Sequence, residues 1–350
     1  MKYFTVAFLL IMIALCAVLF VLPDKIRPVV HDDKFYNDIV GTATTYPIWL
    51  FTSEITTGTG QLVQLLTPPD VGCPHDYALT ANDLLKISGI HKPILLFKNG
   101  AGLDEHLCKA AMAANKDLIV VDTSAGIEVI GDDDDDDDDD HEAEHHHHDS
   151  DEDDDDHEAE HDHEAEHEAE GHHHHHHGGE NGHFFASPNE ARKIVAAIAD
   201  ALSKNDLIHA ESFLDNAEKL DARLEKLADE FKTQLEPYAS KHVAAQHNIF
   251  DYLLRDCGFE TPLAIFADPE TPPSPAEITK LTQEFKEHDV KVIFTEPQYP
   301  DELAKLIGKE TGATVVKIDP VASGPADPPA GYYIDVMSRN LEIMKKALAE

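Results

Sequence analysis

The first half of the chain alternates short apolar runs with segments of helical period. Four apolar runs predict strands: IVGTATTY, QLVQLLTPP, PILLFKNGAG and DLIVVDTSAGIEVI. Three segments between them predict helices: PIWLFTSEI, ANDLLKISG and EHLCKAAMAAN. Strands that alternate with helices are typical of a parallel sheet covered by helices. We therefore expect an N-terminal α/β lobe over residues 38–204.

The second half of the chain repeats this alternation. Strands are predicted at KHVAAQH, PLAIFA, VKVIFTEP and ATVVKIDP, and helices at NIFDYLLRDCG, AEITKLTQEFKEHD, DELAKLIGKETG and DVMSRNLEIMKKALA. This pattern predicts a second α/β lobe over residues 239–350.

A long helical pattern separates the two halves. It begins at Ser187 and Pro188, which stand in the expected N-cap and N1 order, and it breaks near Asn205. Its second part, residues 205–238, is charged and apolar on one face, so it could bridge two domains. The predicted fold is therefore α/β, with two lobes, each a mainly parallel sheet flanked by helices, joined by one long helix. A ligand is expected between the lobes, outside the carboxyl ends of the strands.

The N-terminus has a different pattern. One lysine precedes an apolar run from Tyr3 to Leu22, which predicts that residues 1–23 are a signal peptide or a membrane anchor. Cys16 follows a leucine rather than a small residue, which argues against lipidation. Residues 24–37 are a polar tether. We expect the rest of the chain to be periplasmic or otherwise extracytoplasmic, and membrane-associated if the segment stays uncleaved.

An insert interrupts the first lobe at residues 132–180. It holds 26 acidic residues and 15 histidines, with no lysine, arginine or large apolar residue. Such a segment cannot bury enough apolar surface to offset its ordering entropy, so we expect a disordered loop. Imidazoles suit zinc, copper and nickel, and clustered carboxylates concentrate divalent cations. Possible accessory metal ligands are His141, His145, His157, His161, His163, His167, His172, His174 and His176.

The net charge of the chain indicates which classes of partner it can bind. The net charge is -41, of which the insert contributes -26 and the rest of the chain -15. No basic patch exists to bind phosphates, so no nucleic acid is expected as a partner.

Three HEAEH segments in the insert match the metalloprotease motif H-E-x-x-H. That motif works only on a fixed helix with a third ligand, so the copies indicate repetition rather than catalysis.

Four residues outside the insert stand at strand or loop ends. His75 lies in GCPHDY, His183 in NGHFF, His247 at the end of KHVAAQH and Asp319 at the end of VVKID. Such positions are where ligands gather in an α/β cleft. Three imidazoles and one carboxylate suit tetrahedral Zn²⁺, with bonds of about 2.0–2.2 Å. More oxygen ligands would favour manganese.

The cysteines and one glutamate add alternatives. Cys73, Cys108 and Cys257 remain beyond the N-terminal segment, so at most one intrachain disulfide can form. Cys73 and Cys108 lie in the same predicted lobe and are the preferred pair. Cys73 is otherwise a thiolate ligand beside His75, and Cys257 is expected as a buried thiol. Glu296 in FTEPQ is expected to form hydrogen bonds at the end of its strand. The alternative is a carboxylate near the metal site.

These motifs resemble the zinc-uptake substrate-binding proteins of ABC transporters, the ZnuA-like metal receptors. The resemblance covers about residues 40–349 and rests on TTYPIW, LLTPP followed by PHDY, NGAGLDEHL, NGH with SP soon after, QHNIFDYL, VIFTEPQ and KIDP. It implies two lobes joined by a rigid helix. It also implies a cleft metal held by the three histidines, with Asp319, a neighbouring carboxylate or water completing the sphere.

The resemblance also bears on the metal and has departures. Members selective for manganese tend to replace the third histidine with glutamate, so His247 indicates zinc. Gly182 and Ser187 stand where the family usually has proline and aspartate.

The leading hypothesis is a receptor, not an enzyme, and a monomer. It would deliver Zn²⁺ to an ABC permease, with a loop that scavenges or senses zinc. The alternative is a zinc storage or buffering metallochaperone. A manganese receptor is less favoured because of His247. A secreted zinc hydrolase is less favoured because no general base stands at a fixed spacing from the histidines.

Overall fold

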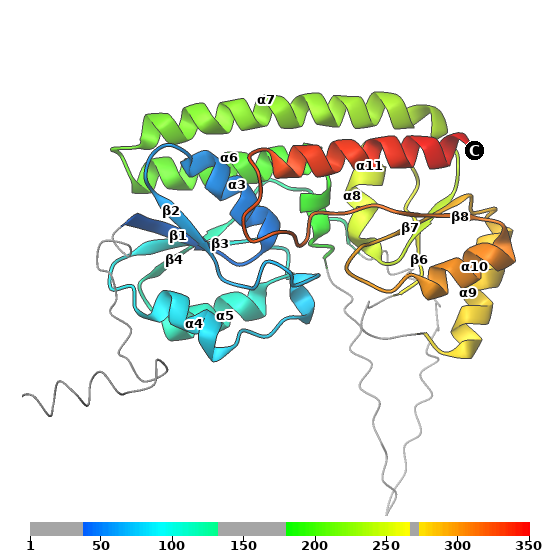
Figure 1. The fold of residues 1–350 in the computed structure, drawn as a ribbon, viewed down its shortest axis with the longest axis horizontal. Helices are drawn as coiled ribbons and strands as arrows, with labels where there is room; N and C mark the ends of the chain where they lie inside the picture. The colour runs from blue at the N-terminus through cyan, green and yellow to red at the C-terminus, as the bar shows by residue number, and fades with distance from the viewer. Residues whose placement is uncertain (1–37, 132–179, 267–272) are drawn as a thin grey trace, which may run out of the picture.

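A computed structural model describes residues 38–131, 180–266 and 273–350 (Figure 1). The predicted signal or anchor segment, the tether and nearly all of the insert, with its candidate accessory histidines, lie outside the described residues. No helix within the described residues is long and apolar enough to cross a membrane.

The first lobe is built on a four-stranded parallel sheet in the order β2-β1-β3-β4. The strands are β1 (Ile39–Ala43), β2 (Leu62–Leu65), β3 (Ile94–Lys98) and β4 (Leu118–Asp122). The helices are α3 (Tyr46–Thr56), α4 (Ala81–Ser88) and α5 (Glu105–Ala114). Strands β1 and β3 are almost wholly buried, as their continuous apolar runs predict for a sheet covered on both faces.

The second lobe repeats the topology of the first, with a parallel sheet in the order β6-β5-β7-β8. Its strands are β5 (Val243–Ala245), β6 (Leu263–Ala264), β7 (Val292–Thr295) and β8 (Thr314–Lys317). Its helices are α8 (Asp251–Asp256), α9 (Pro275–Glu287) and α10 (Glu302–Thr311). The predicted fold class, two lobes with parallel sheets flanked by helices, is confirmed.

Three long helices pack on the same side of the two sheets: α6 (Pro188–Asn205), α7 (Ala210–Leu235) and α11 (Tyr332–Ala349). In Figure 1, α7 runs along the top of the view above both sheets, with α6 and α11 beneath it. The break predicted near Asn205 separates α6 from α7. Helix α7 buries a stripe with the spacing of one helix face: Phe213, Ala217, Leu220, Leu224, Leu227, Phe231 and Leu235.

The core explains how the lobes are held together. One large cluster of buried side chains includes Phe97 from β3, Phe294 from β7 and the buried stripe of α7. Two smaller clusters lie elsewhere, one with Ile94 and Leu96 of the first sheet and one with Ile293 of the second. This shared cluster contains buried side chains from both sheets and from α7, so it joins the two lobes. The loops after the strands are therefore positioned on a common support.

Candidate metal centre

Cys73, His75, His183 and His247 converge on one point. One ligand atom from each lies within 4.8 Å of the others. The ring centroids of His183 and His247 are 5.0 Å apart, and that of His75 lies 5.8 Å from His183 and 6.4 Å from His247. The group offers one cysteine sulfur and three imidazole nitrogens, which are ligand types found in tetrahedral zinc sites.

Short turns position these side chains. Cys73 and His75 flank Pro74, which begins a 3-10 turn over Pro74–Asp76. His183 begins a second 3-10 turn, His183–Ala186, which leads through the Ser187 N-cap into α6. His247 comes one residue after Gln246, which directly follows β5, so it stands at the carboxyl end of a central strand. The centre therefore combines ligands from the loops of both lobes, where an α/β cleft is expected to bind.

Asn181 fixes the ring of His183. Its Oδ1 lies 2.9 Å from His183 Nδ1 and also accepts the backbone N–H of His183 at 2.9 Å. Its Nδ2 donates to the carbonyl oxygen of Asn248 at 2.8 Å and to Asp251 Oδ2 at 3.0 Å, which sets the orientation of the amide. Because Oδ1 can only accept, Nδ1 carries the ring proton. Nε2 is then left with its lone pair for a metal.

The pKa of His183 lies well below its usual value. Burial is the main cause, and the neighbouring rings of His247 and His75 lower the pKa further. The side chain is 4 % exposed. A low pKa keeps the imidazole neutral, and a metal binds only the neutral ring.

Glu296 supports His247. Its Oε1 lies 2.7 Å from His247 Nδ1, and both side chains are almost fully buried. The contact is close, although the two groups are not aligned for a linear hydrogen bond. The backbone N–H of Glu296 donates to Gln246 Oε1 at 2.7 Å, which holds the strand end. His247 Nε2 is buried and meets no hydrogen-bond partner within the described residues. A buried ring nitrogen without a partner is suited to a metal ion.

His75 lies at the solvent side of the centre. Its side chain is exposed, whereas Cys73, His183 and His247 are buried. An ion would therefore approach past His75 and lose water as it meets the buried ligands.

Asp319 lies outside the converging group, contrary to the four-ligand set expected from the sequence. Its Oδ1 accepts the backbone N–H of Val321 at 2.9 Å, and Gln298 Nε2 lies 3.5 Å away. Burial raises the pKa of this carboxyl group. The side chain turns back to close its own loop, whereas Cys73 stands in the converging group.

The predicted disulfide is also corrected, because Cys73 and Cys108 form no bridge. Cys73 belongs to the large shared core, and Cys108 in α5 belongs to the smaller cluster beside the first sheet. Burial raises the pKa of the Cys108 thiol above its usual range and that of Cys257 to about 12. Cys257 is a buried thiol, as expected.

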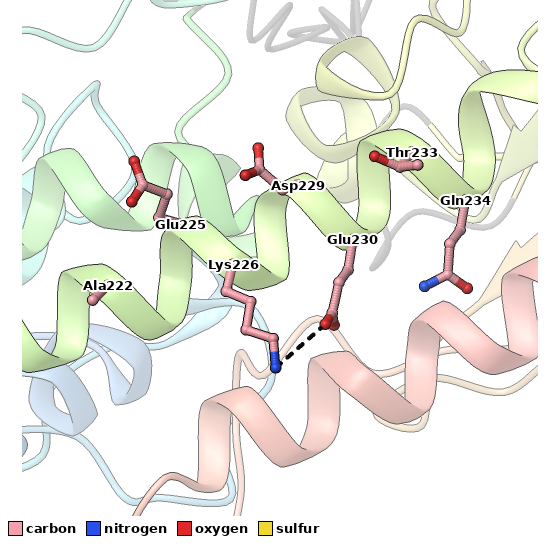
Figure 2. A pocket seen from close by; sticks show the side chains of 7 residues that line it. All are labelled: Ala222, Glu225, Lys226, Asp229, Glu230, Thr233 and Gln234. Carbon is pink, nitrogen blue, oxygen red and sulfur yellow. Dashed lines mark ion pairs between the residues drawn. The ribbon is translucent and has the colours of Figure 1, made fainter.

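A separate surface depression lies along α7 (Figure 2). Its lining is Ala222, Glu225, Lys226, Asp229, Glu230, Thr233 and Gln234. Lys226 Nζ pairs with Glu230 Oε1 at 3.6 Å, and both side chains point toward α11 in the figure. None of the four converging side chains lines this depression.

Solved structures place the fold in a class. The structure is similar to the substrate-binding protein FpvC of Pseudomonas aeruginosa in complex with Mn²⁺, with a TM-score of 0.68 and 23 % identity over 88 % of this chain and 97 % of that one. The laminin-binding protein Lmb of Streptococcus agalactiae gives a TM-score of 0.66 and 21 % identity over 89 % and 99 %. At this identity the likeness concerns the fold alone, which is a two-lobed α/β fold.

The sequence identifies the family. The profile of the ZnuA family, "Zinc-uptake complex component A periplasmic", matches residues 42–347, and the chain belongs to this family. It is 30 % identical over 169 residues to the high-affinity zinc uptake system protein ZnuA of Bacillus subtilis, covering 47 % of this chain and 53 % of the relative. The zinc-binding lipoprotein AdcA of Streptococcus pneumoniae is 31 % identical over 166 residues, covering 47 % and 33 %. The matches span about half the length of these curated relatives or less.

Two supporting groups of the site were missed from the sequence. Asn181 stands two residues before His183 in NGH, which is the local signal for an amide that caps the ring. Asp251, which binds that amide, is 70 residues away in the chain, so no local pattern predicts it.

Proposed function

We propose that this protein binds Zn²⁺ between its lobes through His75, His183 and His247 and delivers it to an ABC permease outside the cytoplasmic membrane. The observation that carries this proposal is the convergence of three imidazoles, with His247 Nε2 buried and without a hydrogen-bond partner within the described residues. Membership in a zinc-uptake family supports the same conclusion. Zinc is cargo here, so the site must bind tightly and also release.

The chain's own groups account for capture. Asn181 directs Nε2 of His183 into the centre, and Glu296 faces Nδ1 of His247, so that the remaining nitrogen of each ring can point to the ion. Partners of this kind raise the basicity of ligating histidines and hold their orientation. Burial excludes water from three of the four side chains. No general base stands at a fixed spacing from the three histidines in the sequence, which favours a receptor over a hydrolase.

Release would use the division of the ligands between the lobes. His247 follows a strand of the second sheet, whereas His75 follows β2 of the first. A small shift of one lobe on docking would separate these ligands and weaken the complex. The shared core and the three long helices limit the size of such a shift.

Nitrogen ligands favour zinc over manganese, because manganese prefers oxygen. The FpvC structures contain Mn²⁺ in one case and Ni²⁺ in another, so the fold itself does not set the metal. The ligands of this chain carry the argument for Zn²⁺.

The organisation of the full chain is part of the proposal. Residues 1–23 would direct export or anchor the protein, 24–37 would tether it, and the lobes would be residues 38–204 and 239–350, joined by 205–238. We propose a periplasmic or extracytoplasmic monomer. The acidic and histidine-rich insert would gather or sense zinc near the cleft.

Calorimetric titration of the full chain, and of a chain lacking residues 132–180, tests this function. Zinc and manganese are compared, with His247→Ala as the control. One tight zinc site that survives deletion, weakens in the variant and is poor for manganese supports the receptor. If deletion of the insert removes every tight zinc site, the proposed receptor function is contradicted.

That second outcome would favour zinc buffering instead. The composition of the insert, with 15 histidines, is the observation behind this alternative. A buffer would bind several zinc ions per chain through the insert and depend little on His247.

A further inference from the structure

We infer that Cys73 is the fourth protein ligand of the metal, bound as a thiolate beside three histidines. The inference rests on the proposed function, because it concerns the same ion. It adds a ligand type that changes which metals the site accepts.

The sulfur atom lies where a fourth ligand is needed. Cys73 Sγ is 3.0 Å from His183 Nε2, the nitrogen that the Asn181 contact leaves for the metal. It also belongs to the group whose ligand atoms lie within 4.8 Å of one another. A zinc ion bound to both atoms at about 2.0–2.3 Å would replace this direct contact.

The backbone holds Cys73 in this position from both sides. Pro74 follows it, and the residue before a proline is restricted to extended conformations. Cys73 has φ -67° and ψ 133°, in agreement with that restriction. Its backbone N–H donates to the hydroxyl of Tyr299 at 3.2 Å, from the loop after β7 in the second lobe. The thiol is 1 % exposed, so its direction is set by packing.

The nearby carboxylates have other roles. Asp319 Oδ1 accepts the backbone N–H of Val321, and Glu296 Oε1 lies against His247 Nδ1. Neither belongs to the converging group. Among the described residues, Cys73 is therefore the side chain best placed to complete a tetrahedral set with the three imidazoles.

Binding through sulfur has a chemical consequence. The thiol loses its proton to solvent as the Zn–S bond forms, and the resulting thiolate offsets one of the two charges of the buried ion. Thiolate is a soft ligand that suits Zn²⁺ and is poorly matched to Mn²⁺. Cys73 thus acts as a specificity-determining residue in addition to the histidines.

Cobalt substitution tests the inference on the full chain. One equivalent of Co²⁺ replaces zinc, and a sulfur-to-cobalt charge-transfer band is sought in the near ultraviolet. The insert contains no cysteine, so cobalt bound there gives no such band. We expect the band in the wild type and in Cys108→Ser, a matched control for a buried thiol, and its loss in Cys73→Ser. We also expect Cys73→Ser to weaken zinc binding by more than about 100-fold, since even outer-shell partners contribute about 10–100-fold.

The outcomes separate the two proposals. Tight binding that depends on the histidines but shows no sulfur band, or a band that persists in Cys73→Ser, overturns the thiolate ligand and leaves the receptor function intact. Binding that is insensitive to His247→Ala overturns the receptor function itself. X-ray absorption at the zinc edge of the wild type counts sulfur neighbours without a variant, so a folding defect in Cys73→Ser does not decide the result.

Discussion

Asn181 accepts two hydrogen bonds from one histidine: Oδ1 meets both the backbone N–H and the ring Nδ1 of His183 at 2.9 Å. The same amide donates to Asp251 of the second lobe. This residue therefore links the orientation of a candidate metal ligand to the packing between the lobes.

Replacing Asn181 by alanine should weaken zinc binding by about 10–100-fold, because the ring of His183 loses the acceptor that fixes its tautomer. Competition with a chelator measures the affinity. Asn82→Ala is the matched control, since Asn82 is exposed on α4. Asn181→Asp keeps an oxygen acceptor for the ring and should recover part of the affinity. Unchanged zinc affinity in Asn181→Ala would show that the contact does not orient the ligand.

Glu296→Gln tests the support of His247. The change keeps the size of the side chain but removes the negative charge 2.7 Å from His247 Nδ1. We expect zinc affinity to fall by about tenfold, because the ring loses the charge that strengthens it as a ligand. Glu302→Gln, at an exposed position in α10, should leave the affinity unchanged. Equal affinities for the two variants would limit Glu296 to a structural role at the strand end.

The lowered pKa of His183 predicts a pH effect on the metal-free protein. The folded ring resists protonation, whereas the unfolded ring takes up a proton below its ordinary pKa of 6.5. Above pH 6.5 this group therefore leaves the free energy of unfolding unchanged. As the pH falls below 6.5, the group lowers the free energy of unfolding by up to about 1.4 kcal/mol per pH unit.

Urea unfolding from about pH 7 to 5 measures this effect, with His183→Gln as the comparison, because the ordinary histidine pKa of about 6.5 lies in this range. The variant should have a shallower loss of stability than the wild type. Parallel curves would mean that the ring is protonated as easily in the folded protein as in the unfolded one.

The ends of the insert predict that it can be removed. The backbone N–H of Asn181 donates to the carbonyl oxygen of Ile130 at 2.8 Å, so a short connection can join the chain there. Shortening a loop lowers the entropic cost of closing it. The melting temperature of a chain lacking residues 132–180 should therefore not fall. Calorimetric melting of the metal-free proteins checks this. A large drop in melting temperature would show that the insert contributes to folding.

Much of the architecture is local and was predictable. The apolar runs identified strands on buried sheets, and Ser187 with Pro188 identified the start of α6, where the Ser187 side chain accepts from the backbone of Asn189 and Glu190. These signals depend on residues a few positions apart, so a single sequence contains them in full. The three histidines are also candidates from the sequence, because each stands in a loop or at a strand end, and the structure brings their rings together.

Tertiary structure decided the remaining partners of the site. Asp319 and Cys73 were both candidates, and the choice depends on whether each side chain reaches the centre or meets its own loop. Asp319 binds the N–H of Val321, whereas Pro74 and Tyr299 hold Cys73 against His183. Contacts between residues more than a hundred positions apart, such as the Cys73 sulfur and the His183 ring, depend on how distant segments of the chain pack and are not contained in any local pattern.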